Sequence, residues 1–372
     1  MVLHINGNYP HHSLHRALAS KLADFGFEQH ICIPMIGNKY RDVYRLDRLG
    51  VYYDYASILT WRDRIFFLSK VKKIAKHIES SVDMKNIECI LAHTLYSDGA
   101  VARILSKKYG IPFSVVVRNT DINTHMKYRP YLDWLVERIA YEAKNIILIT
   151  PSYYEKIVHK IGTLQSEKIC IIPNAVDDFW FESRAVVKDL HAPVELISVG
   201  EINKNKNLGT TLKIIKALND RGITLHFTVV GDGKLTKKYK RAAKRLGVAD
   251  SVSFEGWQNS KEKIKEYYEK SDIFIMLSFK ETFGAVYIEA LSQGLPIIYT
   301  RNQGVDGYFQ QGSVGYSCDP RDVDCAAESL IKIIERYSDI SKESLLEAKR
   351  FSIEKTAFKY KQVIDRMMYN EP

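Results

Sequence analysis

Residues 273–297 read IFIMLSFKETFGAVYIEALSQGLPI, and no other stretch decides the fold as directly. The apolar run Ile273–Leu277 predicts a short, buried strand. Gly284 then opens a helix that stops at Gly294, with Pro296 just beyond it as a second stop signal. Ligands bind at the carboxyl ends of the strands in open parallel sheets. The loop between this strand and this helix is therefore the first place to expect a functional site.

Two glutamates and a helix start define the chemistry expected at this loop. Glu281 lies in the loop itself, and Glu289 lies about two turns into the helix. The backbone amides of Gly284, Ala285 and Val286 would face an anion there, helped by the helix dipole. Carboxylates beside an anion site suit a phosphate attached to sugars, because sugar hydroxyls donate to carboxylates.

The composition describes a globular, basic chain. At 372 residues, two domains of ordinary size are expected, and 26% charged with 46% hydrophobic residues excludes a disordered protein. No apolar run approaches the ~18 residues of a membrane span. The opening segment resembles a first strand and not a signal peptide, and the five cysteines form no CxxC pair. We therefore expect a cytoplasmic protein.

The formal net charge of +10 predicts an acidic partner. Nucleic acid, an anionic membrane surface and phosphorylated substrates all fit, but no helix-turn-helix, zinc-finger or RNP-like pattern supports nucleic acid. Residues 61–78 place apolar side chains at helical spacing between lysines. This segment is either a helix lying on anionic headgroups, peripheral to the inner face of the cell membrane, or a core-facing helix with a basic solvated face.

Strands and helices alternate in both halves of the chain, which predicts parallel, doubly wound sheets. The expected strands of the first half are 2–5, 31–33, 87–91, 113–117, 146–149 and 169–172, and those of the second half are 194–199, 224–230, 252–254, 273–277 and 295–299. We expect a first domain over 1–178, a linker over 179–193, a second domain over 194–350 and a final amphipathic helix within 351–372.

The segment 278–297 resembles the E-x7-E motif of retaining GT-B glycosyltransferases, family 4 in particular. The resemblance rests on the two glutamates with Thr-Phe-Gly between them and Glu-Ala-Leu-x-x-Gly-x-Pro after them. It implies a GT-B fold of class α/β, with two Rossmann-like domains facing a central cleft. It also implies that residues 351–372 return to the first domain.

The resemblance assigns roles on the donor side. Glu281 would contact donor-sugar hydroxyls and Glu289 the ribose, while the Phe283–Val286 backbone (Phe283, Gly284, Ala285, Val286) would meet the sugar or phosphate. Residues 198–208 resemble the family segment V-G-R-L-x-x-x-K, whose arginine and lysine grip the donor diphosphate. Lys206 takes the lysine position.

Three other donor-side positions follow from the same resemblance. Glu201 stands where the family has its arginine, so Lys204 is the candidate substitute for that charge. Gly231 lies in a glycine-rich turn near the nucleotide, mostly for architectural reasons. Trp257 follows the stretch whose backbone typically receives the nucleobase.

The acceptor side resembles the family less closely. Gly7 follows the opening strand, where relatives have a glycine-rich loop. Arg118 stands where relatives often carry a histidine that contacts the donor sugar. It could pair with an acidic group on the donor or acceptor, or with Asp121. His93, which follows another strand, is a second candidate for contact with the substrate.

No metal site or cofactor is expected beyond the nucleotide-sugar cosubstrate. Asp322-Val323-Asp324 is a DxD pattern, which binds a divalent metal in GT-A enzymes, but here it is interpreted as the acidic start of a helix. The histidines near the start lack partner ligands at any zinc-site spacing; they are His4, His11, His12 and His15.

Together these features predict a retaining, metal-independent glycosyltransferase. It would move a hexose-like sugar from a UDP- or GDP-sugar to an acceptor hydroxyl, on a lipid-linked glycan of surface polysaccharide biosynthesis. Two alternatives stay open: a transferase with a small soluble acceptor, and a nucleotide-sugar-binding protein that has lost catalysis. The second stays open because Glu201 replaces the arginine of the family. A basic nucleic-acid-binding protein is the least favoured.

Overall fold

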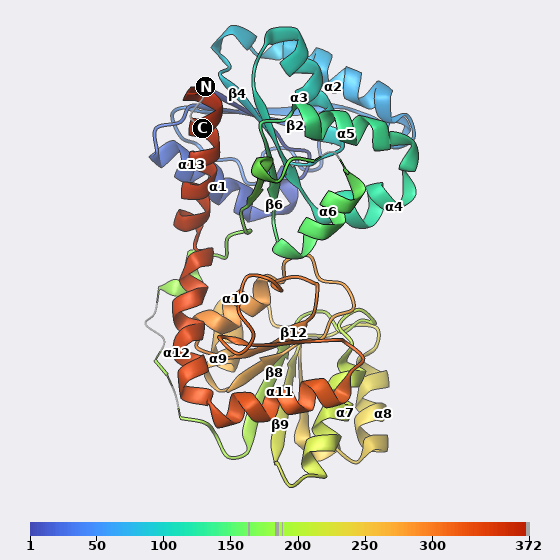
Figure 1. Ribbon diagram of the computed structural model, residues 1–372, viewed down its shortest axis with the longest axis vertical. Helices are drawn as coiled ribbons and strands as arrows, with labels where there is room; N and C mark the ends of the chain where they lie inside the picture. The colour runs from blue at the N-terminus through green and yellow to red at the C-terminus, as the bar shows by residue number, and fades with distance from the viewer. Residues whose placement is uncertain (163, 183–185, 188, 370–372) are drawn as a thin grey trace. The chain divides into compact units, whose positions relative to one another are not determined.

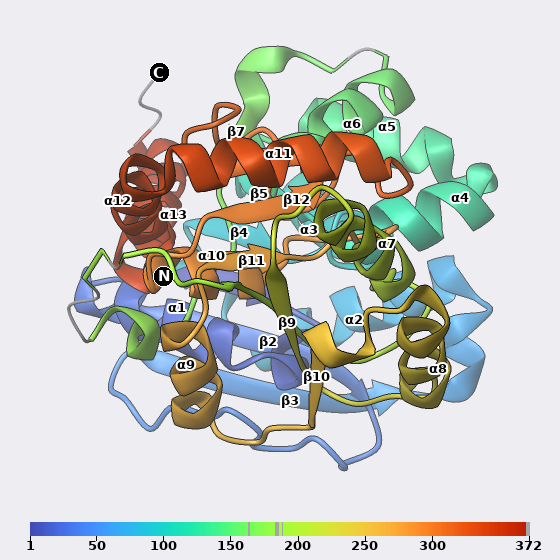
Figure 2. The same ribbon diagram turned by 90° about the horizontal axis from the view of Figure 1, so that it is seen from below.

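The computed structural model describes residues 1–162, 164–182, 186–187 and 189–369. The chain forms two compact units, one made of Met1–Ala175 with Ile353–Pro372 and the other of Val176–Ser352 (Figures 1 and 2). The predicted α/β class with doubly wound parallel sheets is confirmed in both units. Trp180, in the segment expected to be a linker, is buried in the core of the second unit.

Within the described residues, the sheet of the first unit has seven parallel strands in the order β3-β2-β1-β4-β5-β6-β7. The strands are β1 (Val2–Ile5), β2 (Gln29–Ile36), β3 (Val51–Leu59), β4 (Cys89–Ala92), β5 (Phe113–Val117), β6 (Asn145–Leu148) and β7 (Ile169–Ile171). The inner strands are nearly continuous apolar runs because helices cover both faces of the sheet. The order of the strands reverses its direction between β1 and β4.

The helices of the first unit are α1 (Ser13–Asp24), α2 (Phe67–Ser81), α3 (Ser97–Tyr109), α4 (Met126–Tyr128), α5 (Asp133–Glu142), α6 (Tyr154–Lys160) and α13 (Ile353–Tyr369). The last of these, α13, packs against α1 although the two are more than 300 residues apart along the chain (Figure 1). Its buried face, which includes Tyr360, Val363, Ile364 and Met367, belongs to the core of this unit.

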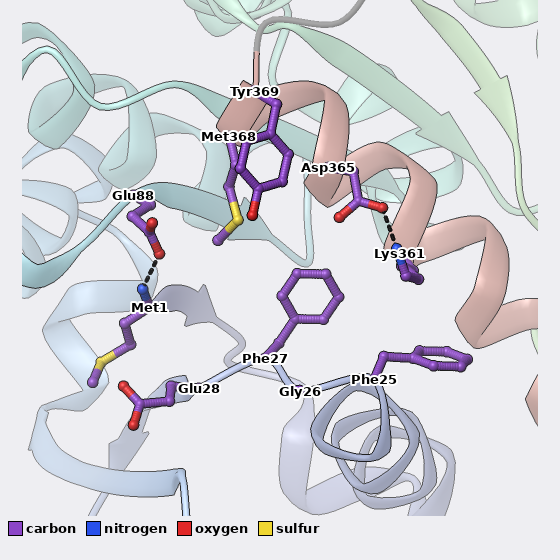
Figure 3. Close-up of a pocket in the computed structure, with 10 residues that line it drawn as sticks. All are labelled: Met1, Phe25, Gly26, Phe27, Glu28, Glu88, Lys361, Asp365, Met368 and Tyr369. Atoms are coloured by element: carbon purple, nitrogen blue, oxygen red, sulfur yellow. Dashed lines mark hydrogen bonds and ion pairs between the residues drawn. The ribbon is translucent and has the colours of Figure 1, made fainter.

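A hollow of about 500 Å³ lies beside α13 at the amino-terminal edge of the first sheet (Figure 3). Met1, Glu28 and Glu88 line it, and each directly precedes a strand. On the helix side, Lys361 pairs with Asp365, and its ammonium lies 6.0 Å from the centroid of the Phe27 ring. Because ligands of such sheets bind at the carboxyl edge, this hollow marks where α13 docks and not where chemistry is expected.

Within the described residues, the second unit has a six-stranded parallel sheet in the order β10-β9-β8-β11-β12-β13, which reverses its direction between β8 and β11. Its strands are β8 (Val194–Val199), β9 (Leu225–Val230), β10 (Val252–Gly256), β11 (Ile273–Ile275), β12 (Ile297–Thr300) and β13 (Gly315–Cys318). Its helices are α7 (Leu208–Asn219), α8 (Thr236–Leu246), α9 (Lys261–Glu269), α10 (Ala285–Ser292), α11 (Val323–Glu335) and α12 (Tyr337–Ala348).

The basic segment 61–78 is a core-facing helix along most of its length. Val71, Ile74 and Ile78 of α2 are buried in the core of the first unit, and the lysines between them face solvent. Along this part of α2 the apolar face is not available to lipid, because the sheet and α3 already cover it. Only the residues just before and at the start of α2 expose apolar side chains. No helix in the described part of the chain is long and apolar enough to cross a membrane.

The packing of α13 generates a stability prediction. Ile364 is fully buried, so Ile364→Ala should lower the free energy of unfolding by about 3 kcal/mol through lost burial and the cavity left behind. Its neighbour Gln362 is exposed on the same helix, and Gln362→Ala should change stability by no more than about 0.5 kcal/mol. Urea unfolding followed by circular dichroism compares the two; equal midpoints would show that α13 contributes little to the first unit.

Candidate functional site

Two glycine turns pack against each other where β8 and β9 end. The Gly200 amide donates to the Val230 carbonyl at 2.9 Å. A Cβ on Gly231 would lie 2.0 Å from the Gly200 carbonyl oxygen, and one on Gly233 would lie 2.3 Å from that of Ile202. No side chain fits at either position. Gly231 is therefore required by the packing of the turns, whatever it contributes to a ligand.

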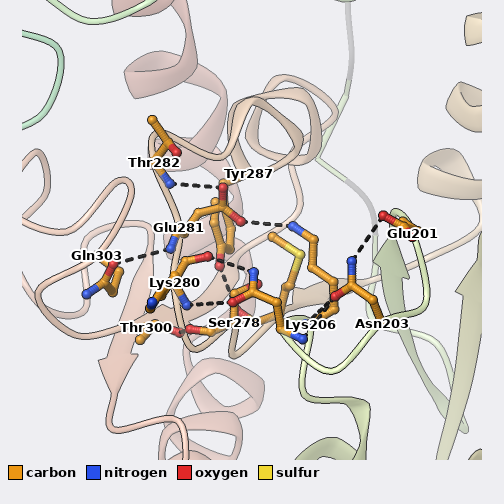
Figure 4. A network of polar contacts seen from close by, with 12 residues as sticks. Glu201, Asn203, Lys206, Ser278, Lys280, Glu281, Thr282, Tyr287, Thr300 and Gln303 are labelled. Carbon is orange, nitrogen blue, oxygen red and sulfur yellow. Dashed lines mark hydrogen bonds and ion pairs between the residues drawn. The ribbon is translucent and has the colours of Figure 1, made fainter. Parts of the chain in front are cut away.

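The loop after β8 is held by its own asparagines. The Oδ1 atom of Asn203 accepts from the backbone amides of Asn205 at 2.9 Å and Lys206 at 3.2 Å. Asn205 in turn bonds the backbone of Lys280 twice, donating to its carbonyl at 2.8 Å and accepting from its amide at 2.9 Å. These bonds fasten the loop between β8 and α7 to the loop between β11 and α10 (Figure 4).

Lys206 and Glu281 meet across these two loops. The Lys206 ammonium donates to Glu281 Oε2 at 2.9 Å (Figure 4). Their side chains are 21% and 14% exposed, so solvent screens the attraction less than it does for a surface pair. The predicted diphosphate-binding lysine and the predicted sugar-binding glutamate thus form one partly buried ion pair.

The backbone around Glu281 is fixed by the loop that follows β12. The Glu281 amide donates to Gln303 Oε1 at 3.2 Å, and the Gly304 amide donates to the Glu281 carbonyl at 3.1 Å. The Thr282 amide donates to the carboxylate of Glu281 at 3.1 Å. Glu281 is therefore held by loops that follow three strands, β8, β11 and β12.

Glu289 lies in α10 and has different neighbours. The hydroxyl of Tyr268, which comes from α9, lies 3.5 Å from Glu289 Oε2. Burial raises the pKa of Glu289 to about 7, while the tyrosine hydroxyl acts to lower it. Burial thus favours the neutral form of this carboxyl group.

The remaining donor-side residues are placed as follows. The Phe283 side chain is buried, which leaves its backbone as the part able to meet a ligand. Gly284 has φ +76, and a Cβ there would lie 2.5 Å from the Tyr287 ring, so this position requires glycine. The helix α10 begins at Ala285, and no side chain caps its first backbone amides, which include those of Ala285 and Val286. Trp257, at 61% exposure, follows the end of β10. Lys204 and Glu201 are both exposed, and Glu201 accepts from Asn203 Nδ2 at 3.1 Å.

In the first unit, Asp121 organises the carboxyl edge. Its carboxylate is buried and accepts from the backbone amides of Leu95 at 3.2 Å, Tyr96 at 3.2 Å and Arg118 at 2.8 Å. Burial raises the pKa of Asp121 to about 6, and these three amides act against that rise. Asp121 thereby joins the loops that follow β4 and β5.

Arg118 directs its guanidinium to neutral oxygens. The guanidinium donates to the His93 carbonyl at 3.3 Å and to Asn174 Oδ1 at 3.1 Å. Arg118 bonds Asp121 through its backbone alone: its amide donates to the carboxylate at 2.8 Å, and its carbonyl accepts from the Asp121 amide at 3.0 Å. Within the described residues, no carboxylate forms an ion pair with this side chain. The predicted alternative of a side-chain pair with Asp121 is therefore wrong.

His93 is buried in a group of three histidines. Its Nε2 lies 3.1 Å from His4 Nδ1, and its ring packs edge-on against His15. Burial lowers the pKa of His93 well below its usual range, so the ring is neutral at physiological pH. Because the side chain is only 2% exposed, the part of His93 that reaches the edge is its carbonyl, which binds Arg118.

Gly7 lies in the loop after β1, with open space where a side chain would be. A Cβ there would meet only Asp98 Oδ1 and the Pro34 carbonyl, both at 3.9 Å. Its φ is not in the left-handed range, so the backbone itself does not demand glycine. Asp98, on α3, is buried, and burial raises its pKa to about 7.

No group of three or more His, Cys, Asp or Glu side chains in the described residues is placed to hold a metal ion. Asp322 Oδ1 accepts from the Cys325 amide at 2.9 Å and caps α11, so the predicted acidic helix start is confirmed. Sequence reasoning missed the residues that orient the pair, Asn203, Asn205 and Gln303. The available signal was that polar residues follow the expected strands 194–199 and 295–299 at the carboxyl edge.

Two family models together cover most of the chain. Residues 15–178 match the model for Glycosyltransferase Family 4, and residues 181–350 match the model for Glycosyl transferases group 1. The amylovoran biosynthesis glycosyltransferase AmsK of Erwinia amylovora is 25% identical over 157 residues, which is 41% of this chain and 38% of that protein. The alignments span less than half the length of the first two curated relatives that the chain matches.

Solved structures resemble the whole chain. The lipopolysaccharide outer core galactosyltransferase WaaB has a TM-score of 0.75 at 15% identity, covering 98% of this chain and 99% of that one. HepE of Anabaena, solved in complex with UDP, has a TM-score of 0.71 at 13% identity with the same coverage. These likenesses concern the fold, and the two family models agree with them. The chain therefore belongs to the GT-B glycosyltransferases of the family 4 kind.

Proposed function

We propose that this chain is a retaining, metal-independent glycosyltransferase that moves a hexose-like sugar from a UDP-sugar to an acceptor hydroxyl. The observation that carries the proposal is the Lys206–Glu281 pair at 2.9 Å, at the carboxyl edge beside the start of α10. A UDP donor is supported by HepE, whose solved complexes include UDP and UDP-glucose. GDP is the alternative nucleotide.

The ion pair is suited to exchange its partners when a donor binds. A diphosphate offers the Lys206 ammonium more negative charge than one carboxylate does, and sugar hydroxyls can donate to the released Glu281. The uncovered amides at Ala285 and Val286 suit a phosphate oxygen or a sugar hydroxyl. Glu289 would accept from the ribose, and Trp257 would lie beside the base.

The reaction then needs no protein nucleophile. The bond between the anomeric carbon and the diphosphate oxygen breaks, and the acceptor oxygen bonds to that carbon from the same face. The departing diphosphate takes the proton of the acceptor hydroxyl. Lys206 stabilises the negative charge that develops on the diphosphate, and Lys204 is a second cation for the same purpose. In other enzymes a divalent metal stabilises this charge.

Arg118 supplies positive charge on the acceptor side. Its guanidinium binds two neutral oxygens and keeps its charge available to an acidic group of the donor or acceptor. His93 holds Arg118 through its carbonyl, and Gly7 leaves room for a substrate to approach the backbone. A lipid-linked glycan of surface polysaccharide synthesis is the acceptor that we propose, since AmsK and WaaB are named for polysaccharide or lipopolysaccharide synthesis.

Donor binding can be tested without knowing the acceptor. At ~100 times its dissociation constant, UDP-glucose should stabilise the folded chain by about 2.7 kcal/mol, visible as a rise in the unfolding midpoint that EDTA does not abolish. Lys206→Ala should weaken binding by roughly 10- to 100-fold, because a charge-assisted bond is lost. Lys213→Ala, at an exposed position of α7, is the matched control. If GDP-sugars shift the midpoint and UDP-sugars do not, the nucleotide is wrong. If neither does, the interpretation as a donor-binding enzyme fails.

Substitution of Arg118 tests whether this residue acts in donor binding or in turnover. Arg118→Ala should leave the UDP-induced shift unchanged and lower turnover at saturating donor by roughly 100-fold, the scale of one charged interaction with a transition state. Arg118→Lys should restore part of it. Turnover is measured as UDP release in the presence of membranes that contain lipid-linked glycans. Unchanged kinetics in Arg118→Ala would remove this residue from the site.

The raised pKa of Glu289 generates a pH prediction. The native group keeps its proton up to about pH 7, whereas the unfolded one loses it near its usual pKa of 4.5. Its contribution to stability is thus full below that lower pKa and is lost as the pH rises through 7. The free energy of unfolding of Glu289→Gln, measured relative to that of the natural chain, should therefore be higher at about pH 8 than at about pH 5. Urea titrations at both pH values test this; a pH-independent difference would mean that the native carboxyl titrates normally.

A further inference from the structure

Two segments of the first unit meet at the start of α2. The first, residues 61–68, contains the short helix Trp61–Arg64 that follows β3, and the second, residues 127–134, runs from α4 into α5. Arg129 joins them: its guanidinium donates to the Arg64 carbonyl at 3.1 Å and lies 5.7 Å from the centroid of the buried Phe67 ring. Figure 1 shows α4 next to α2. We call these two segments the aromatic-basic surface.

This surface exposes large apolar side chains from both segments. The exposed fractions are 65% for Trp61, 61% for Phe66 and 66% for Tyr128, so each ring is more exposed than buried. Ile65, Tyr131 and Trp134 are exposed as well, the last of these at 49%. With Leu68, which is 50% exposed, the two joined segments expose seven large apolar side chains. Scattered exposed rings need no explanation, but a group of this size marks an interaction surface.

The charges on the surface are positive. Its basic residues are Arg62, Arg64, Lys127 and Arg129. Its two acids are already paired inside the unit: Asp63 accepts from the Thr60 amide and lies 3.5 Å from the Lys73 ammonium, and Asp133 pairs with Lys160. The charge left to meet a partner is therefore positive, and the partner is anionic.

Trp and Tyr rings with apolar bodies and polar tips, set among arginines and lysines, match the interface between headgroups and acyl chains. We propose that the aromatic-basic surface docks the first unit on an anionic phospholipid bilayer. The inference rests on the proposed function, because the lipid-linked acceptor of that function resides in such a bilayer. The contact is made by the tip of α2 and by α4, and not by the length of α2.

An adjoining groove supports the same occupant. It has a volume of about 530 Å³ and shares Lys127 with the surface. Ile122 and Met126 give it an apolar wall, and α6 contributes Lys156, His159 and Lys160 together with one acid, Glu155. Its two sides follow β5 and β6, so it lies on the same carboxyl edge as Arg118. An apolar groove with a cationic rim suits one phosphate-bearing lipid of the bilayer.

Vesicle sedimentation with the full chain tests the proposal. The chain should bind vesicles that contain phosphatidylglycerol and bind vesicles of phosphatidylcholine alone far less. Trp61→Ser with Phe66→Ser should weaken binding on the order of ten-fold or more, because two rings no longer enter the interface. Arg62→Ser with Lys127→Ser should weaken it by about five-fold per lost cation, and added salt should reduce the difference.

Leu49→Ser is the matched control. Leu49 is 95% exposed in the same unit but precedes β3, whereas Trp61 follows it. The nine residues of β3 separate the two ends by about 30 Å. This variant should bind vesicles as the natural chain does. The UDP-glucose shift of every variant is measured in parallel, so that failure of the lipid contact is distinguished from failure of donor binding.

Three results would overturn the proposal. The first is binding to both kinds of vesicle that Trp61→Ser with Phe66→Ser leaves unchanged. The second is no binding to either kind. The third is a natural chain that dimerises in solution through these residues and becomes monomeric in the double variant, which would make a second copy the occupant. A retained UDP-glucose shift with lost vesicle binding in the double variant supports it.

Discussion

The order of the strands is the constraint on which the candidate site of each unit depends. In the second unit the sheet reverses its direction between β8 and β11, so these strands are neighbours although the chain visits two others between them. The loops that follow them therefore leave the sheet side by side. Lys206 comes from one loop and Glu281 from the other, and this adjacency brings together two side chains that are 75 residues apart. The first unit repeats the arrangement with β1 and β4, followed by Gly7 and His93.

Sequence reasoning predicted which loop and helix form the donor side, but it did not predict the contacts between the side chains. A strand, a glycine and a helix are local patterns, so the loop of Glu281 and the start of α10 could be placed from spacing alone. The pairing of Lys206 with Glu281 requires the strand order, which local periodicity does not contain. Sequence reasoning did not identify Asn203 and Gln303 for the same reason, because a side chain that orients another is recognised only once its partner is known.

The strands that sequence reasoning missed are both at sheet edges. β3 and β13 close the outer ends of the two sheets. An inner strand is covered on both faces and forms a continuous apolar run, whereas β3 mixes buried and exposed positions and contains three tyrosines and an aspartate. β13 has a glycine and a serine among its four residues. For the segment 61–78, periodicity shows that one face of a helix is apolar but not what covers it, so two interpretations stayed open until the packing of Val71, Ile74 and Ile78 was known.

The two units treat charge differently, and this bears on what each can recognise. In the second unit, Lys206 and Glu281 neutralise each other, which limits the cost of holding two charged groups partly out of water. A ligand with both an anion and hydroxyls can replace each partner at once, whereas a simple anion would leave the carboxylate without its counter-charge. In the first unit, the guanidinium of Arg118 donates to two neutral oxygens and, within the described residues, forms no ion pair with a carboxylate. Under the proposed function, a sugar phosphate would replace both partners of the pair in the second unit, and Arg118 in the first unit would meet an acidic group of a substrate.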